Sequence, residues 1–219
     1  MIKITSSLMC ADQLELGKEI RLLEEAGTDW FHVDIMDGTF VPNFALGVWH
    51  LEAIRKATKL PIDTHLMSVN PERHIRKIAE LGADIVIFHV ESAANINDLI
   101  NEIKGYGKLA GIAINPETSI EGVKPYIEGC DIAAFVMSKP GFSGQKFNPL
   151  IQDKVFKLKS FIDSNGYKTE IMVDGAVSTE TIPSLSRAGA TIFVGGTSGL
   201  FGKGKPYKQC IEEMKRSGE

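Results

Sequence analysis

Three segments of the chain share one local pattern, in which a helical stretch ends at a glycine and a run of strand-forming apolar residues follows. They read EEAGTDWFHVD from Glu24, AELGADIVIFHV from Ala79 and SRAGATIFVGG from Ser186. Glycine can take the left-handed conformation that ends a helix, and β-branched or aromatic residues then favour a strand. Looser copies of the strand part read KITSSLM, PIDTHLM, LAGIAIN, CDIAAFVM and TEIMVDG. The chain therefore contains about eight expected strands, separated by spacers long enough for helices.

Alternating strands and helices build parallel sheets with right-handed crossovers, and eight such units close into a barrel. The expected strands are almost continuously apolar, as in a parallel sheet that helices cover on one side and that fills its own interior on the other. No Pro/Gly/Ser-rich linker divides the sequence. We predict an α/β protein, a (β/α)8 TIM barrel that forms a single domain over residues 1–219. An open, doubly wound sheet is the alternative, but SSLMCAD stands where its G-x-G-x-x-G fingerprint would follow the first strand.

Charge and cysteine content exclude several classes of protein. The net charge of −4 and the scattered lysines and arginines argue against a surface that binds nucleic acid. No apolar run approaches about 18 residues, and no basic region followed by a long apolar core begins the chain, so we expect a cytoplasmic protein without membrane contact. Cys10, Cys130 and Cys210 lack metal-binding spacing and are expected to be reduced thiols.

Four polar side chains fall at the ends of three expected strands, on the face where barrels of this kind carry their chemistry. In FHVDIMDG the period of two puts His32 and Asp34 on one face, while Asp37 falls out of phase and is expected in a turn. His65 and Met67 lie together near the end of the strand IDTHLM, and Asp174 lies at the end of EIMVD, just before Gly175. One such residue alone would more often be a hydrogen-bonded core group. Together, two imidazoles and two carboxylates suit one divalent metal ion, Zn²⁺, Fe²⁺, Mn²⁺ or Co²⁺, among which the sequence does not choose.

Further residues are expected at the same rim of the barrel. His89 lies seven residues after its helix-ending glycine, as Asp34 does, and both a contact with substrate and a purely structural role are open for it. The glycine-rich segments PGFSGQ, from Pro140, and GGTSGLF, from Gly195, follow the expected sixth and eighth strands. Such turns can present several backbone N–H groups to one phosphate, so they favour a small phosphorylated substrate.

Four motifs follow one another along the chain in the order HVDIMDGTFVPN, DTHLM, PGFSGQKF and MVDGAV. With them the sequence closely resembles the ribulose-phosphate 3-epimerases from Ile4 to about Phe201. That family is a (β/α)8 barrel that inverts C3 of a ketose phosphate, classically interconverting ribulose 5-phosphate and xylulose 5-phosphate. The resemblance implies a metal-dependent isomerase of the pentose phosphate pathway that forms a homo-oligomer, either a dimer or a hexamer.

The resemblance also implies roles for individual residues. Asp34 and Asp174 would transfer protons on opposite faces of the sugar and would bind the metal together with His32 and His65. A cation at O2 and O3 would stabilise the enediolate that forms when the C3 proton leaves. The implied substrate contacts are Ser7, Met36, His65, Met67, Met137, Gly141, Phe142, Ser143, Gly144, Gly175, Ala176, Gly196, Thr197 and Ser198.

Two features depart from the common family pattern. VMSKPGF is one residue shorter between Met137 and Pro140 than the usual spacing, which leaves open the placement of Met137 and a role for Lys139 toward phosphate. SLMCAD and GTSGLF resemble the allulose-6-phosphate 3-epimerase branch of the family. We therefore expect ribulose 5-phosphate as the substrate, with conversion of allulose 6-phosphate to fructose 6-phosphate as the alternative.

Two more distant alternatives belong to other functional classes. The barrel could bind a sugar phosphate without converting it, or it could catalyse metal-assisted hydrolysis. The pair Asp34 and Asp174 counts against a pure binder, which needs no proton acceptor on each face of its ligand. Hydrolysis requires a ligand set that leaves an attacking water in place, and no residue pattern singles one out.

Overall fold

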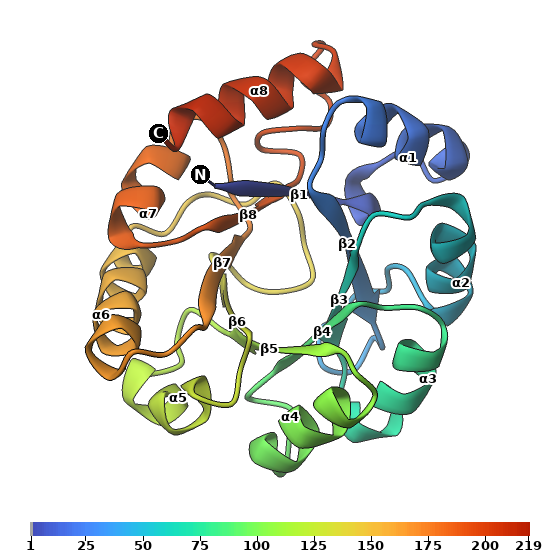
Figure 1. The fold of residues 1–219 in the computed structure, drawn as a ribbon. Coiled ribbons are helices and arrows are strands. Elements are labelled where there is room, and N and C mark those ends of the chain that lie inside the picture. Colours follow the sequence, from blue (N-terminus) through green and yellow to red (C-terminus); the bar gives the residue numbers. More distant parts are fainter. Residues whose placement is uncertain (1) are drawn as a thin grey trace.

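Eight parallel strands pair in chain order, and the eighth pairs with the first, so that the sheet closes into a barrel (Figure 1). The computed structural model describes residues 2–219. The strands are β1 Lys3–Ser7, β2 Trp30–Met36, β3 Ile62–Met67, β4 Ile85–His89, β5 Leu109–Ile114, β6 Ile132–Val136, β7 Glu170–Asp174 and β8 Ile192–Gly195. The predicted (β/α)8 barrel is confirmed.

Helices connect successive strands and form a ring around the barrel (Figure 1). They are α1 Leu16–Glu25, α2 Val48–Ala57, α3 Ile75–Glu80, α4 Ile96–Gly105, α5 Ile120–Ile127, α6 Leu150–Asn165, α7 Ile182–Ala188 and α8 Tyr207–Ser217. Two 3-10 helices, η1 Leu8–Cys10 and η2 Pro71–Arg73, follow β1 and β3. The repeat of helix and strand read from the sequence thus extends over the described chain.

The predicted left-handed glycines end their helices as expected. Gly27, Gly82 and Gly189, which follow α1, α3 and α7, have φ values of 85°, 105° and 112°. At two of them space is also short: a Cβ atom on Gly82 would lie 2.5 Å from the side chain of Arg55, and one on Gly189 would lie 2.3 Å from Lys159. A side chain at either position would add a clash to the backbone strain, so both the helix end and the packing there favour glycine.

Alternate strand residues serve two separate apolar layers. Residues such as Phe31, Phe88 and Phe135 face outward, are fully buried and pack with the apolar residues of the helices. The inward layer, which fills the barrel, consists of Trp30, Ile85, Ile87, Ala113, Ile132, Ala134, Val136, Met172, Ile192 and Val194. Each such buried large side chain stabilises the fold by about 1.5–3 kcal/mol relative to exposure. Both faces of the strands are covered, which explains their nearly continuous apolar sequence.

Strand register brings the polar strand-end residues level with one another. Asp34 of β2 pairs with His65 of β3, Ser7 of β1 pairs with His32, and Asp174 of β7 pairs with Val136 of β6. Because carboxyl ends of parallel strands share one rim, residues far apart in sequence meet there.

Membrane crossing and cysteine chemistry can be judged directly in the structure. Over residues 2–219, no helix has both the length and the apolar character that a bilayer crossing requires. All three cysteines are free thiols: Cys130 and Cys210 are buried, and Cys10 is half-buried near the barrel rim.

Candidate active site

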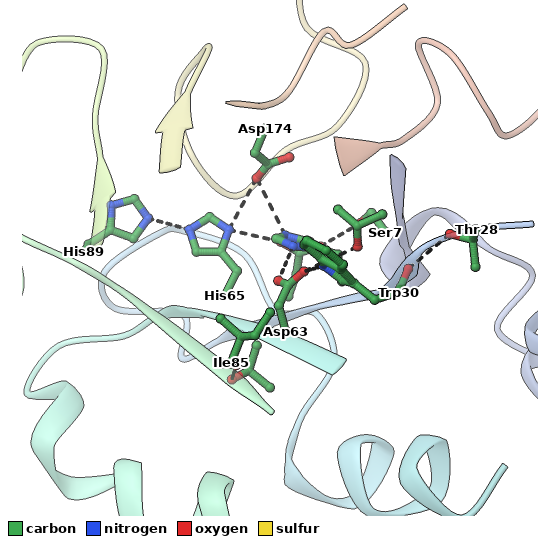
Figure 2. Close-up of polar contacts among 12 residues, drawn as sticks. Ser7, Thr28, Trp30, Asp63, His65, Ile85, His89 and Asp174 are labelled. Atoms are coloured by element: carbon green, nitrogen blue, oxygen red, sulfur yellow. Dashed lines mark hydrogen bonds and ion pairs between the residues drawn. The ribbon is translucent and has the colours of Figure 1, made fainter. Parts of the chain in front are cut away.

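The structure brings His32, Asp34, His65 and Asp174 together at the C-terminal rim of the barrel. One potential donor atom from each lies within 4.8 Å of the others. His32 Nε2 is 3.2 Å from Asp34 Oδ1 and 3.8 Å from Asp174 Oδ2. His65 Nδ1 is 3.4 Å from the same Asp34 oxygen and 3.3 Å from the same Asp174 oxygen. Figure 2 shows Asp174 and the His65 ring facing each other in this cluster.

Four of the six separations between these atoms are close to those of donors around one tetrahedral metal ion. Donors bonded at about 2.1 Å around such an ion lie about 3.4 Å from one another. Four of the six donor–donor distances, the His–Asp distances of 3.2–3.8 Å, lie close to that value, and all six are within 4.8 Å. In the described part of the chain, the buried Nδ1 of His65 has no hydrogen-bond partner, so a cation could use its lone pair. Two imidazole nitrogens and two carboxylate oxygens are donors suited to the divalent transition metals. The four residues could therefore hold a metal ion.

The electrostatics of the cluster also favour a cation. Burial by itself would raise the pKa of Asp34, but the imidazoles of His32 and His65 offset burial and hold that pKa well below its usual value. Burial would lower the pKa of His32, yet Asp63 and Asp34 raise it well above the ordinary value. The pKa of His65 is likewise raised, because Asp174 and Asp34 outweigh the effect of burial. Carboxylates that increase the proton affinity of both imidazoles create a potential that attracts positive charge.

Asp63 is a site residue that sequence reasoning missed. Its side chain is fully buried inside the barrel, and its Oδ1 lies 2.5 Å from His32 Nδ1. Its other oxygen accepts a hydrogen bond of 2.6 Å from Trp30 Nε1 (Figure 2). A carboxylate behind a histidine fixes the orientation of the ring. The available signal was the alternation in IDTHLM, which puts Asp63 on the same face as His65.

His89 touches His65 rather than the pocket above the cluster. Its Nε2 lies 2.9 Å from His65 Nε2, the two rings stack with centroids 5.0 Å apart, and its Nδ1 lies 3.2 Å from Glu91 Oε2. His89 is fully buried, and burial lowers its pKa to about 4, so the ring is neutral at pH 7. Of the two roles that the sequence left open, a direct contact with substrate has no support in this placement.

A pocket opens above the cluster. Among the residues predicted to contact substrate, those that line it are Ser7, Met36, His65, Met67, Gly141, Phe142, Ser143, Gly144, Gly175, Ala176, Gly196, Thr197 and Ser198. Asp34 and Asp174 form part of its wall, and Ser7 Oγ donates a 2.8 Å hydrogen bond to Asp34 Oδ2. A concave site lined by several convergent polar groups is the usual binding place of a small metabolite.

Met137 is the one predicted substrate contact that the structure does not bring to the pocket. Its side chain is fully buried in the outer apolar layer, together with Ala133 and Phe135 of β6. The neighbouring residues Val136 and Ser138 line the pocket instead. Side chains alternate between the two faces along a strand, so Met137 points outward, as Ala133 and Phe135 do.

The two glycine-rich segments both line this pocket and approach each other there. Gly144 approaches Thr197, such that a Cβ atom on the glycine would lie 3.5 Å from Thr197 Oγ1. Among residues 2–219 no group hydrogen-bonds to that buried hydroxyl, which leaves it available to a ligand. Asn43 Nδ2 donates a 2.7 Å hydrogen bond to the Gly141 carbonyl and ties the first segment to the loop after β2. Lys139 is exposed at the pocket wall.

Comparison with known proteins gives a decisive match. The model of the ribulose-phosphate 3-epimerase family matches residues 3–201. The chain belongs to that family. A ribulose-phosphate 3-epimerase of Methanocaldococcus jannaschii is 44% identical over 218 residues, which cover 99% of this chain and 91% of the relative. The enzyme of that name from Bacillus subtilis is 38% identical over 218 residues, 99% of this chain and 100% of the relative. The family resemblance read from four motifs is thus confirmed.

Solved structures support the fold alone. The 3-keto-L-gulonate-6-phosphate decarboxylase of Vibrio cholerae superposes with a TM-score of 0.71 at 13% identity, covering 99% of this chain and 96% of that one. A phosphoribosylanthranilate isomerase of Thermotoga maritima gives a TM-score of 0.65 at 12% identity, covering 100% and 98%. At such identities the shared barrel carries no information on which reaction the epimerase-family chain catalyses.

Proposed function

We propose that the protein is a metal-dependent isomerase that inverts C3 of a ketose phosphate and interconverts D-ribulose 5-phosphate and D-xylulose 5-phosphate. The placement of Asp34 and Asp174 carries the proposal. Both carboxylates lie beside the same two imidazoles in the wall of one pocket, yet they come from β2 and β7, which are not neighbours in the barrel. Two carboxylates that reach a substrate from different sides are what inversion of a carbon requires. The names of the relatives from M. jannaschii and B. subtilis agree with this activity.

The proposed mechanism divides proton transfer between the two carboxylates. Asp34 removes the C3 proton on one face and Asp174 delivers a proton to the other, with the roles exchanged in the reverse direction. Ser7 holds one Asp34 oxygen by its 2.8 Å hydrogen bond, while the other faces the imidazoles. The Asp174 side chain is 21% exposed and that of Asp34 is 4% exposed, so protons from solvent reach Asp174 more readily. A divalent ion held by His32, Asp34, His65 and Asp174 would supply positive charge beside the enediolate oxygens.

The glycine-rich segments are the proposed phosphate site. Gly141 to Gly144 and Gly196 to Ser198 line the same pocket as the two carboxylates. Backbone N–H groups in such turns can bind phosphate oxygens, and the buried Thr197 hydroxyl is available to add a hydrogen bond. A phosphate held there would leave the sugar carbons between the loops and the proton-transfer pair.

Allulose 6-phosphate is a second candidate substrate because both motifs of that branch meet at the phosphate end of the pocket. Cys10 of SLMCAD and Thr197 of GTSGLF both line it, and a Cβ atom on Gly196 would lie 3.5 Å from Cys10 Sγ. The shape of this end of the pocket would determine how many sugar carbons fit between C3 and the phosphate.

Comparison of kcat/KM for the two substrates tests the assignment. We expect the value for ribulose 5-phosphate to exceed that for allulose 6-phosphate by at least about tenfold, since one extra carbon in a fitted pocket changes transition-state binding by roughly 1–3 kcal/mol. A higher kcat/KM for allulose 6-phosphate would assign the protein to the allulose-6-phosphate 3-epimerase branch. Tight binding of both sugars without turnover of either would instead identify a non-catalytic sugar-phosphate-binding barrel.

Other features of the proposal rest on the family resemblance. We propose one bound ion per site, with Zn²⁺, Fe²⁺, Mn²⁺ and Co²⁺ as the candidates. The enzyme is proposed to act in the cytoplasm as a homo-oligomer, a dimer or a hexamer. Elemental analysis of freshly purified protein identifies the bound ion, and the mass of the protein in solution gives its oligomeric state.

A further inference from the structure

The ring of His65 connects the proposed metal site to a row of hydrogen-bonded polar groups, the buried His89 and the more exposed Glu91. Its Nδ1 faces Asp34 and Asp174 at 3.4 Å and 3.3 Å, and its Nε2 faces His89 Nε2 at 2.9 Å. In Figure 2 His89 lies on the far side of the His65 ring from Asp174. The Nδ1 of His89 continues the row to Glu91 Oε2 at 3.2 Å. The His65 ring thus links the metal site to His89 and, through His89, to Glu91.

Glu91 is itself held in place by the loop after β5. Its Oε1 accepts hydrogen bonds from the Asn115 backbone N–H at 2.9 Å and from the Thr118 hydroxyl. Burial would raise the pKa of Glu91, but hydrogen bonds from His89, Thr118 and Asn115 lower it below its usual value. The carboxylate is therefore ionised, and an ionised carboxylate can only accept hydrogen bonds.

The direction of each hydrogen bond from Glu91 to His65 follows from the ionised state of the Glu91 carboxylate. Glu91 accepts, so His89 Nδ1 carries a proton and donates. His89 is fully buried, and a buried neutral ring costs less than a buried charged one, so its Nε2 is an acceptor. His65 Nε2 must then carry the proton shared at 2.9 Å. The remaining nitrogen of a neutral His65, Nδ1, presents a lone pair to Asp34 and Asp174.

We infer that His89 and Glu91 are positioning residues that fix the ring orientation and the tautomer of His65, so that its Nδ1 lone pair points into the metal site. The inference rests on the metal site proposed above. His32 has a corresponding support in Asp63, whose Oδ1 lies 2.5 Å from His32 Nδ1. The two imidazoles therefore have different supports, one a direct carboxylate and the other a histidine that relays a carboxylate. Such supports typically affect metal affinity 10–100-fold.

Binding of Co²⁺ to the metal-free protein tests the inference without measuring turnover. His89→Phe keeps a ring of similar size but removes both nitrogens, and we expect it to weaken Co²⁺ binding about 10–100-fold. The visible absorption of bound Co²⁺ should change with it, since the His65 donor loses its orientation. His89→Gln keeps an acceptor for His65 and should restore much of the affinity. Glu91→Gln should weaken binding in the same direction by a smaller factor. Affinity is measured by competition with a chelator.

Controls separate positioning from general damage to the fold. His74→Gln removes an exposed imidazole and should leave Co²⁺ affinity and absorption unchanged. Thermal unfolding of each metal-free variant reports on the fold; Glu91 lies in a loop at the protein surface, so Glu91→Gln provides the test if His89→Phe does not fold. Wild-type affinity and absorption in His89→Phe, or in Glu91→Gln where the former is unfolded, would overturn the inference. Failure of the wild-type protein to bind Co²⁺ would overturn both the inference and the metal site, whereas missing turnover with intact Co²⁺ binding would overturn only the proposed reaction.

Discussion

We expect Asp174→Asn to lower kcat for ribulose 5-phosphate by about 10²- to 10⁴-fold, the usual contribution of a positioned acid or base. Asparagine has nearly the same shape but cannot accept and return a proton. The side chain lies at a strand end and is 21% exposed, so the barrel should fold as before. Because Asp174 is also a proposed metal ligand, kcat is measured at saturating metal.

A carboxylate away from the site gives the matched control. The side chain of Asp153 on α6 is 64% exposed, and within residues 2–219 its one ion pair is with Lys157 in the next helical turn. Asp153→Asn should leave kcat within about twofold of the wild-type value, because an exposed ion pair contributes little to stability and lies on the outer ring of helices. Activity of Asp174→Asn above a few per cent of wild type would remove Asp174 from the proton-transfer role.

Removal of divalent metal with a chelator should reduce kcat by more than about 100-fold, because Lewis-acid stabilisation of a developing oxyanion is worth several kcal/mol. Activity should return when Co²⁺, Mn²⁺, Zn²⁺ or Fe²⁺ is added. Metal should also stabilise the fold against heat, by about 2.7 kcal/mol when free metal exceeds its Kd about 100-fold.

The barrel itself should survive this treatment. Its apolar layers pack independently of the four donor residues, so circular dichroism of the metal-free protein should match that of the loaded one. Full activity in protein shown by elemental analysis to be free of metal would contradict the proposed role of the cluster.

The barrel and the donor cluster could be predicted because both depend on local signals. Asp34, His65 and Asp174 lie in the C-terminal halves of three strands, with His32 on the same face as Asp34, and in a parallel barrel the C-terminal ends of the strands share one rim. Asp37 was predicted in a turn, and its Oδ1 accepts from the backbone N–H groups of Thr39 and Phe40 at 2.7 Å and 2.8 Å. In each case the neighbours in sequence carried the information.

What the sequence did not reveal depends on contacts between strands. The contact of Asp63 with His32 requires the register of β2 with β3, and the contact of His65 with His89 requires that of β3 with β4. Neither register can be read from a single strand, since the period of two gives only the face on which a side chain lies. Met137 was taken as a pocket residue from the family pattern, but the alternation along β6 turns it outward with Phe135.

Deuterium exchange tests the central claim, proton transfer at C3 by two carboxylates, most directly. The metal-loaded protein is incubated with ribulose 5-phosphate or with allulose 6-phosphate in D₂O, and the position of deuterium is read by NMR. We predict deuterium at C3 of the epimerised product, because the proton delivered on the second face comes from a carboxylate that exchanges with solvent. Absence of deuterium at C3 with both substrates would contradict the account.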